Sequence, residues 1–275
     1  MTTGGCTPRH DHRGRREAAV VSDGSALREC GAAVELIVRE FAEHLSGLAE
    51  VPVRPVTVEA VDAAQLGAGI RALPADVGPV LVTHADLERT RLVQQDLHGS
   101  TGLLVLTDQD ATAIALTAAV LSAVADGGRR APAGGRVVVA GAHYVPILPA
   151  LLAAAGVADI TTWNASDAVT FPLRHVMYGA DALVDLVGAL PGWVAEGRHS
   201  TTAVITRGDA RTAPCVAAGL LRAAVCDPDA TFDVVTYLAA ARALTTAPPP
   251  LTQRKARILT NRVADAVKSL AHTAR

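Results

Sequence analysis

The chain has 275 residues, of which 50% are hydrophobic and 19% are charged, with a formal net charge of −2. This much apolar material can form a large core, which excludes a disordered chain. Nucleic-acid-binding domains carry a basic excess, so the charge excludes nucleic acid as a partner. At about 150 residues per domain, the length predicts one large or two modest domains. Aromatic residues make up only 3%, so aliphatic side chains must fill the core.

Residues 1–16 form a polar, arginine-rich stretch that we predict to be a disordered tail. It lacks the apolar segment of a signal peptide. The longest apolar run, 114–125, is shorter than the roughly 20 residues that span a bilayer. The four cysteines are scattered and form no CxxC pair, a usage typical of reduced thiols. The sequence therefore predicts a cytoplasmic protein without a membrane partner.

From residue 18 onwards, short β-branched runs alternate with segments of helical period, which is typical of parallel sheets with crossover helices. In the first predicted helix, hydrophobic residues recur at three- and four-residue steps from Leu27 to Phe41, with Asp23 or Ser25 as the cap. The predicted fold class is therefore α/β with parallel sheets. The predicted strands cover 18–21, 53–58, 79–83, 102–106, 136–140, 159–163 and 202–206.

A run rich in glycine, proline and arginine over 127–135 is the strongest boundary signal in the chain. It precedes a second strand and helix. Three consecutive prolines at 248–250 then stop another helix. The predicted parts are a first domain over 17–128, a second, Rossmann-like domain over 129–247, and a C-terminal helix over 251–275 that packs back onto another element.

Several segments have the order and spacing of a known family. They read AAVVSDGSA at 18–26, VREFA at 38–42, TDQDATA at 107–113 and APCVAAGLLRAA at 213–224. A strand, turn and helix at 136–155 stand between the last two. In the malic enzymes the corresponding segments read AVVSDGTAVLG, FKEFA, DDQHGTA and NVLCFPGIFRGA. The chain therefore resembles a divergent malic enzyme over most of its length.

The resemblance implies a substrate- and metal-binding domain followed by a dinucleotide-binding domain, in a chain that forms a homodimer. Malic enzymes oxidise malate with NAD(P) and a divalent cation, Mg²⁺ or Mn²⁺, and then decarboxylate the product. A base takes the hydroxyl proton as hydride leaves, the cation stabilises the enolate, and an acid returns a proton to carbon. The chemistry therefore requires an acid, a base, a metal site and a dinucleotide turn.

The acid and the base of the family are missing from their expected places. The resemblance puts Val34 where the family has its catalytic lysine, and helical spacing predicts a core role for Val34. The chain has only two lysines, Lys255 and Lys268, and both lie in the last predicted helix. The family's tyrosine comes from a segment before the first strand, where this chain has the polar tail. We predict that ordinary malate oxidation is lost.

The predicted metal ligands are His84, Asp86 and Asp108. The resemblance matches Asp108 with a later aspartate ligand of the family, and it places the family's Glu-Asp pair near Thr83 and His84. With Asp110, these residues could form a mixed nitrogen and oxygen site for Mg²⁺ or Mn²⁺ at strand ends. The alternative is that the carboxylates cap helices, since Asp108 or Asp110 opens the next predicted helix.

The turn after the strand at 136–140 reads GAHYVP. A Rossmann turn needs glycines so that the backbone can approach the pyrophosphate of a dinucleotide. Gly141 keeps the first glycine, but His143 and Pro146 replace the other two, and Asn164 replaces the acidic residue that holds the ribose. If NAD(P) binds, the predicted cofactor-binding residues are Gly141, Ala142, His143 and Asn164.

Two arginines lie just before the place, near Thr212, where the resemblance expects the family's paired asparagines. Arg207 and Arg211 follow a predicted strand, and a guanidinium group binds a carboxylate in a bidentate way, so they are the predicted substrate ligands. We predict a ligand- or partner-binding pseudoenzyme, with a small carboxylate or another protein as its partner. A structural subunit that pairs with an intact relative is a third class. The alternative is a repurposed enzyme for a small organic acid, dependent on NAD(P) or a metal, whose catalytic candidates are Asp108, His143 and Tyr144.

Overall fold

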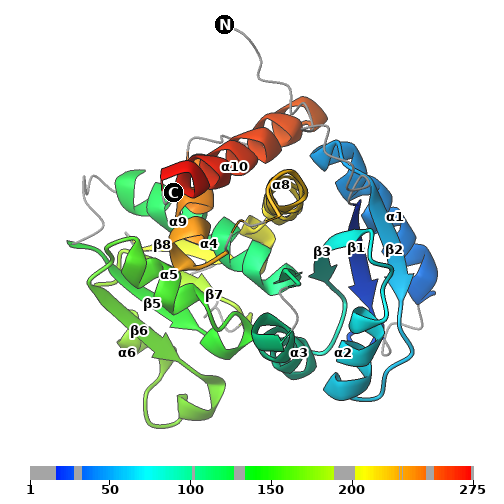
Figure 1. Cartoon of the computed structure of the whole chain (residues 1–275). Helices are drawn as coiled ribbons and strands as arrows, with labels where there is room; N and C mark the ends of the chain where they lie inside the picture. The colour runs from blue at the N-terminus through cyan, green and yellow to red at the C-terminus, as the bar shows by residue number, and fades with distance from the viewer. Residues whose placement is uncertain are drawn as a thin grey trace, which may run out of the picture. The chain divides into compact units, whose positions relative to one another are not determined.

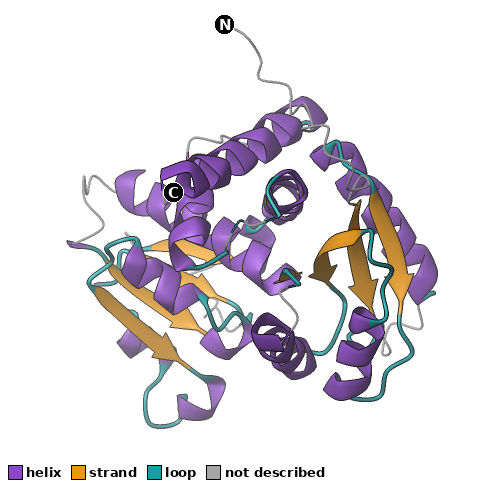
Figure 2. Ribbon diagram, viewed as in Figure 1, coloured by secondary structure: helices purple, strands orange, loops and turns teal. Residues whose placement is uncertain are grey.

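A computed structural model describes residues 17–27, 33–100, 103–126, 134–188, 202–228, 230, 232–245 and 251–273. The tail predicted over 1–16 and most of the boundary predicted over 127–135 lie outside these residues. The described residues form two compact units, each with a parallel four-stranded sheet and helices (Figures 1 and 2). The predicted α/β class with parallel sheets is confirmed. Of the described residues, those within 17–108, 217–230 and 267–273 belong to the first unit, and those within 109–216 and 232–266 belong to the second.

The first unit contains strands β1 (Glu17–Ser22), β2 (Val53–Thr57), β3 (Val77–Val82) and β4 (Val105–Thr107), and helices α1 (Val34–Ala49), α2 (Ala63–Arg71) and α3 (Leu87–Ser100). Its strand order is β2-β1-β3-β4, and all three pairs are parallel. The central strand β1 is buried along nearly its whole length, as expected for a strand of a covered parallel sheet. Strand β2 lies at the edge, where Pro55 is tolerated because one side of the strand makes no ladder hydrogen bonds.

Helix α1 begins at Val34, whereas the residues directly after β1 form a turn. The predicted cap at Asp23 or Ser25 is therefore wrong, because Ala33 precedes the helix and the side chains of Asp23 and Ser25 bind each other and residues near the start of α3. Asp23 accepts hydrogen bonds from the backbone and the hydroxyl of Ser25, at 2.9 and 2.6 Å. Its other oxygen forms an ion pair with Arg89 in α3, and the Asp23 side chain is fully buried. This buried pair connects the end of β1 with α3.

The second unit contains strands β5 (Arg136–Ala140), β6 (Asp159–Trp163), β7 (Ala182–Asp185) and β8 (Ala203–Thr206), in the order β6-β5-β7-β8 with all pairs parallel. Its helices include α4 (Asp108–Asp126), α5 (Leu148–Ala154), α6 (Leu173–Val176) and α9 (Val234–Leu244). Helices α8 (Ala213–Cys226) and α10 (Gln253–Thr273) contribute residues to both units.

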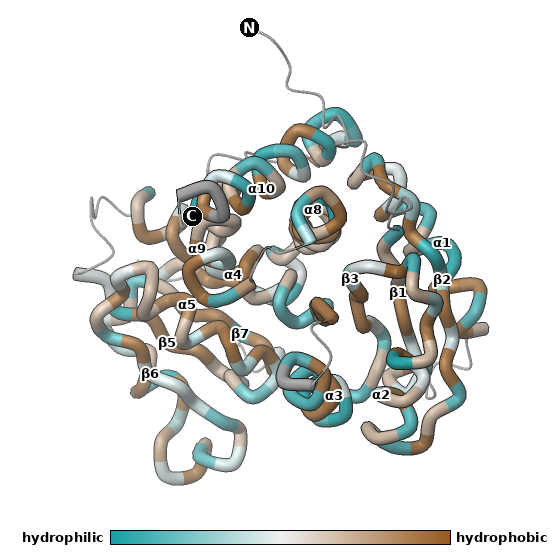
Figure 3. Tube along the Cα trace, viewed as in Figure 1, coloured by the Kyte–Doolittle hydropathy of each residue, from teal (hydrophilic) through white to brown (hydrophobic). Residues whose placement is uncertain are grey.

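The central strands of both sheets are largely hydrophobic, as the colours along β1, β3, β5 and β7 show (Figure 3). Strands β5 and β6 have the bounds that the sequence predicts. Strand β7 is missing from the prediction because its run ALVD is four residues long and contains a single β-branched residue. It nevertheless lies inside the sheet, fully buried between β5 and β8.

Helix α10 covers most of the region predicted as a C-terminal helix, and it buries Leu259, Val263 and Val267 along one side. Its Thr260 interacts with Cys215 of α8, and burial raises the pKa of the Cys215 thiol. A buried thiol with a raised pKa is a poor nucleophile, so Cys215 is a packing residue. None of the helices in the described part of the chain has the length and apolar character needed to cross a membrane.

A buried polar pair joins α4 to α9 inside the second unit. Asp110 is 5% exposed and Tyr237 is 4% exposed, and the tyrosine hydroxyl donates a hydrogen bond to the carboxylate. Burial first, and then the negative charge of Asp110, raises the pKa of Tyr237 well above its ordinary value. Asp233, the cap of α9, acts in the same direction. The native state therefore holds the proton on Tyr237 more tightly than the unfolded chain does.

We predict that Tyr237→Phe lowers the free energy of unfolding by about 1–3 kcal/mol, because it removes a donor from a buried carboxylate. Above about pH 10 the unfolded chain releases its tyrosine proton while native Tyr237 keeps it, so the stability contributed by this group is lost as the pH rises. Urea denaturation at several pH values measures both effects. The control is Tyr178→Phe, because Tyr178 is 84% exposed. Equal losses in the two variants, or an alkaline loss that persists fully in Tyr237→Phe, would contradict the prediction.

Candidate functional site

The carboxyl edge of the first sheet brings Thr83, His84 and Asp108 together. Because the strands are parallel, the residues after β3 and β4 meet at the same edge. Asp108 Oδ2 accepts hydrogen bonds from Thr83 Oγ1 at 3.1 Å and from the His84 backbone N–H at 3.3 Å. His84 has a φ of 50°, in the left-handed region that residues other than glycine rarely adopt. The hydrogen bond that the His84 N–H donates to Asp108 helps to hold His84 in this conformation.

The imidazole of His84 has contacts on two sides. Its Nδ1 lies 3.2 Å from Thr83 Oγ1, and its ring packs edge-on against Phe41 of α1 with ring centres 5.7 Å apart. Two of the three predicted metal ligands, His84 and Asp108, are therefore neighbours. The hydrogen bond between them runs from a backbone amide to the carboxylate, so it does not orient the imidazole toward Asp108.

Asp86, the third predicted metal ligand, caps a helix instead. Its Oδ1 accepts the Arg89 backbone N–H at 3.0 Å, which satisfies a donor in the first turn of α3. No group of three or more His, Cys, Asp or Glu side chains is placed to hold a metal ion among the residues that the structure describes. The arrangement of His84, Asp86 and Asp108 thus does not fit the Mg²⁺ or Mn²⁺ site expected from the sequence, and we derive no step through a metal.

Val34 occupies a packing position at the start of α1. Its side chain lies against Gly24, so closely that a Cβ on Gly24 would overlap both methyl groups of Val34. Gly24 also has a φ of +65°, so this loop depends on glycine for two reasons. An apolar side chain wedged against the loop cannot transfer a proton. The position where the resemblance expects a lysine therefore holds no acid or base.

The turn after β5 in the second unit depends on Gly141, which has a φ of +81°. Its N–H donates to the Trp163 carbonyl at 2.8 Å, and its carbonyl accepts the Tyr144 N–H at 2.9 Å. A Cβ at this position would lie 2.6 Å from Val187 Cγ1. The chain therefore turns tightly here, but the turn that follows is a short 3₁₀ helix, η3 (Ala142–Tyr144).

The side chains after Gly141 form a stack. The rings of His143 and Tyr144 have centres 4.1 Å apart and an interplanar angle of 38°. The Arg207 guanidinium carbon lies 4.3 Å from the centre of the Tyr144 ring. Arg207 comes from η5 (Arg207–Asp209), directly after β8, and all three side chains are exposed. The structure therefore brings three of the predicted site residues together at the carboxyl edge of the second sheet.

Asn164, at the end of β6, joins this cluster. Its Oδ1 lies 3.2 Å from His143 Nδ1. Asn164 also begins η4 (Ala165–Asp167) and forms a reciprocal capping box with Asp167. Of the predicted cofactor-binding residues, Gly141, His143 and Asn164 are therefore adjacent, and Ala142 lies within the same turn.

The two predicted substrate arginines differ in their surroundings. Thr206 and Asp209 form a capping box that fixes η5, and Arg207 extends from it over Tyr144. Arg211 instead donates its Nε–H to the Gly208 carbonyl at 3.0 Å. A guanidinium that stacks on an aromatic ring keeps its N–H edge available for a carboxylate, so Arg207 is the stronger candidate of the two.

The turn does not fit a dinucleotide held in the ordinary Rossmann way. That pose needs a backbone free of side chains beside the pyrophosphate and a helix that begins directly after the turn. Here the His143 ring stands at the second glycine position, and α5 begins only at Leu148. Asn164 is engaged with His143 and with the cap of η4. We therefore derive no step through NAD(P).

Sequence reasoning missed Asp185, the last residue of β7. It is 2% exposed, and its Oδ1 accepts the backbone N–H groups of Val187 and Gly188 at 3.1 and 2.9 Å. These bonds shape the loop whose Val187 packs against Gly141. The sequence signal for Asp185 is an aspartate at the end of an apolar run. Such an aspartate marks the end of a strand only where a strand is predicted, and no strand is predicted here.

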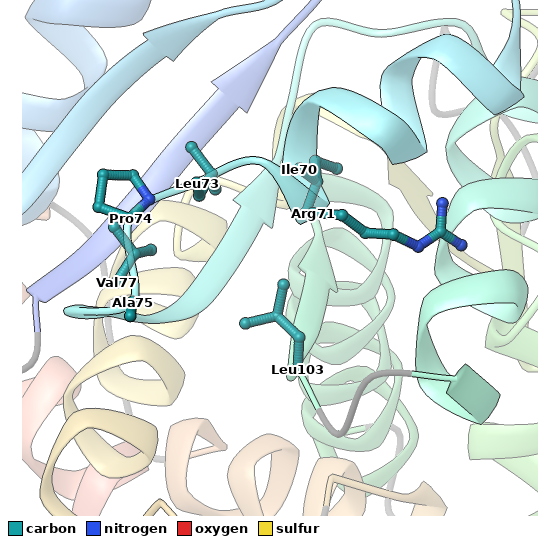
Figure 4. Close-up of a pocket in the computed structure, with 7 residues that line it drawn as sticks. All are labelled: Ile70, Arg71, Leu73, Pro74, Ala75, Val77 and Leu103. Atoms are coloured by element: carbon teal, nitrogen blue, oxygen red, sulfur yellow. The ribbon is translucent and has the colours of Figure 1, made fainter.

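A pocket of about 300 Å³ lies in the first unit, where α2 leads into β3 (Figure 4). It is at the amino ends of the strands, whereas the predicted site residues follow the carboxyl ends. Its only charged lining residue, Arg71, forms an ion pair with Asp96. Its lining residues are Ile70, Arg71, Leu73, Pro74, Ala75, Val77 and Leu103.

Solved structures with a similar fold include several malic enzymes. The malic enzyme of Pyrococcus horikoshii Ot3 matches with a TM-score of 0.75 and 17% identity, over 95% of this chain and 77% of that one. The NAD-dependent malic enzyme of Thermotoga maritima matches with a TM-score of 0.75 and 16% identity, over 93% and 85%. The Entamoeba histolytica malic enzyme matches with a TM-score of 0.73 and 15% identity, over 94% and 70%. No protein-family model and no curated protein matches the sequence. The chain thus has the malic-enzyme fold, which supports the divergent resemblance.

The Gly141 turn yields a stability prediction with a matched control. Gly156 also has a positive φ, of +96°, but a Cβ there would meet no atom within 4 Å. We expect Gly156→Ala to cost about 1–2 kcal/mol through backbone strain alone. Gly141→Ala should cost at least about 1 kcal/mol more, because its Cβ also collides with Val187. Chemical denaturation measures both values, and equal costs would contradict the packing that we describe.

Proposed function

We propose that this chain is a ligand-binding protein with a malic-enzyme fold, which binds a small carboxylate at the carboxyl edge of its second sheet and does not oxidise malate. The observation that carries the proposal is the stack of His143, Tyr144 and Arg207. It joins a cation and an imidazole from two different strand ends. Ligands of open parallel sheets bind at this edge.

The chemistry of the stack favours an anion. The Tyr144 ring supports the Arg207 guanidinium by a cation–π contact, which reduces the freedom that the side chain loses when it binds. A planar guanidinium can then meet a carboxylate with two parallel hydrogen bonds. His143 lies against the same ring and offers a second polar group to the ligand. A small carboxylate therefore suits the site better than an apolar molecule.

The proposed loss of malate oxidation is supported by the residues that stand at the catalytic, dinucleotide and metal positions of the family. Val34 packs against Gly24 at the position where the resemblance expects the catalytic lysine. His143 and Asn164 bind one another where a dinucleotide would need open backbone and an acidic side chain. The predicted metal ligand Asp86 caps α3. Residues at three positions that the resemblance assigns to the reaction thus have other contacts, and together these contacts support the proposal of a pseudoenzyme.

A second candidate, a repurposed enzyme, is favoured by one observation in the first unit. His84 is held in a left-handed conformation at the end of β3, next to Asp108 and Thr83. Strained residues of this kind cluster at functional sites. An imidazole and a carboxylate at a strand end can serve as base and acid toward a small organic acid. In this candidate, His84→Gln abolishes a turnover that Arg207→Gln weakens or leaves intact.

The proposals for oligomeric state and cellular location rest on the sequence. We propose a homodimer, in keeping with the family that the chain resembles, and a cytoplasmic location, in keeping with its scattered cysteines. Light scattering of the purified protein tests the first proposal.

The binding proposal is tested with two arginine variants. A panel of small carboxylates is added to the purified protein, and thermal unfolding is followed. A ligand at 100 times its Kd adds about 2.7 kcal/mol to the stability of the native state. We expect Arg207→Gln to abolish this gain and Arg211→Gln to retain most of it, because Arg211 donates to Gly208. Equal responses of the two variants, or no gain with any carboxylate, would overturn the proposal.

A further inference from the structure

Three side chains at the carboxyl edge of the first sheet form a hydrogen-bond chain, which runs from Asp108 through Thr83 to His84. Thr83 Oγ1 donates to Asp108 Oδ2 at 3.1 Å, and the same hydroxyl oxygen lies 3.2 Å from Nδ1 of His84. Thr83 is 2% exposed, so its hydroxyl is shielded from water. One buried hydroxyl thus connects a carboxylate to an imidazole, and all three residues belong to the first unit.

The direction of the Thr83 proton follows from the groups on its two sides. An ionised carboxylate carries no proton and only accepts hydrogen bonds, and Asp108 Oδ2 also accepts the backbone N–H of His84 at 3.3 Å. If Thr83 gave its single proton to the imidazole, two acceptor oxygens would face each other across 3.1 Å with no proton between them. The Thr83 proton therefore points to Asp108, and the lone pairs of Oγ1 remain for His84.

A lone pair of Thr83 Oγ1 beside Nδ1 requires a proton on that nitrogen. The neutral imidazole of His84 carries one proton, so Nε2 then has the free lone pair. Nε2 forms no hydrogen bond with any residue that the structure describes, and it is not one of the buried side-chain atoms that lack a partner, so it reaches the surface. The edge-on contact with Phe41 holds the ring on another side. The first unit thus presents an oriented hydrogen-bond acceptor at its surface.

We infer that Thr83 is a positioning residue that, backed by Asp108, holds His84 in its Nδ1–H tautomer, so that Nε2 accepts a proton from an O–H or N–H group of a ligand. The inference deepens the second candidate function, which uses His84 as a base, and it does not depend on the anion site of the second unit. In serine proteases an aspartate fixes the tautomer of the catalytic imidazole through Nδ1–H. In this chain a hydroxyl stands between the carboxylate and the ring.

Two substitutions of Thr83 separate the effect of its hydroxyl from the effect of its shape. Thr83→Val keeps the branched side chain and removes the hydroxyl, whereas Thr83→Ser keeps the hydroxyl. The control is Thr90→Val, because Thr90 is also 2% exposed and donates its hydroxyl to the Asp86 carbonyl at 2.8 Å. It removes a buried threonine hydroxyl that has no contact with an imidazole. Circular dichroism checks that each variant is folded.

The tautomer is measured by ¹⁵N NMR of the imidazole nitrogens at about pH 8, where an ordinary imidazole is neutral. His84→Gln assigns the signals of His84. We expect a protonated Nδ1 and an unprotonated Nε2 in the parent, in Thr83→Ser and in Thr90→Val. Thr83→Val should shift the ratio of the two tautomers about fivefold toward protonated Nε2, the worth of one net hydrogen bond. A protonated Nε2 in the neutral ring of the parent, or a pattern that Thr83→Val leaves unchanged, would overturn the inference.

The free lone pair is measured with diethyl pyrocarbonate. Nε2 attacks a carbonyl carbon of the reagent, a C–N bond forms and a C–O bond of the anhydride breaks. The Nδ1 proton passes to the ethyl carbonate that leaves, which decomposes to ethanol and CO₂. Mass spectrometry follows the rate of this modification at His84. We expect Thr83→Val to react about fivefold more slowly than the parent, and Thr83→Ser and Thr90→Val to react at the parent rate.

The outcomes separate this inference from the second candidate function. If His84 reacts in the parent and reacts equally fast in Thr83→Val, the imidazole is an open base and the second candidate stands, but the positioning role of Thr83 is wrong. If His84 does not react in the parent although NMR shows a protonated Nδ1, the tautomer is right, but Nε2 is closed to ligands. The proton-accepting role and the second candidate function then fail together.

Discussion

In both sheets every described strand pair is parallel. The chain must therefore cross back over the sheet between one strand and the next. Two consequences follow. The central strands β1, β3, β5 and β7 are buried along nearly their whole length, which the aliphatic composition of this chain allows. The loops after the strands must also share one edge. That edge brings His143, Asn164 and Arg207 together in the second unit although the sequence separates them widely.

Much of the fold can be predicted from the sequence, because buried parallel strands are continuous β-branched runs. The bounds of β5 and β6 follow directly from such runs. Strand β7 could not be found in this way, because its burial comes from its neighbours in the sheet and its own sequence has little β propensity. The predicted cap of α1 is wrong for a related reason. Asp23 pairs with Arg89, which lies in a different helix and far along the chain.

The candidate site could be predicted only in part. Residues that follow strands are candidates for a site, so the sequence predicts Gly141, His143 and Arg207 from their positions. The contacts between their side chains cannot be predicted in this way, because the sequence contains no sign that Tyr144 lies between an imidazole and a guanidinium. Asp86 Oδ1 accepts a backbone hydrogen bond at the start of α3, which matches the helix-capping alternative that the sequence leaves open for the carboxylates of this region.

The central claim is that this fold binds a small anion without the reaction of the malic enzymes. The most direct measurement is the formation of NADH or NADPH by the purified protein with malate, Mn²⁺ and either dinucleotide, alongside a calorimetric titration of the same preparation with small carboxylates. The account predicts no reduced dinucleotide above the protein-free blank and a binding signal that disappears in Arg207→Gln. Formation of reduced dinucleotide above the blank, or a binding signal that Arg207→Gln retains, would contradict it.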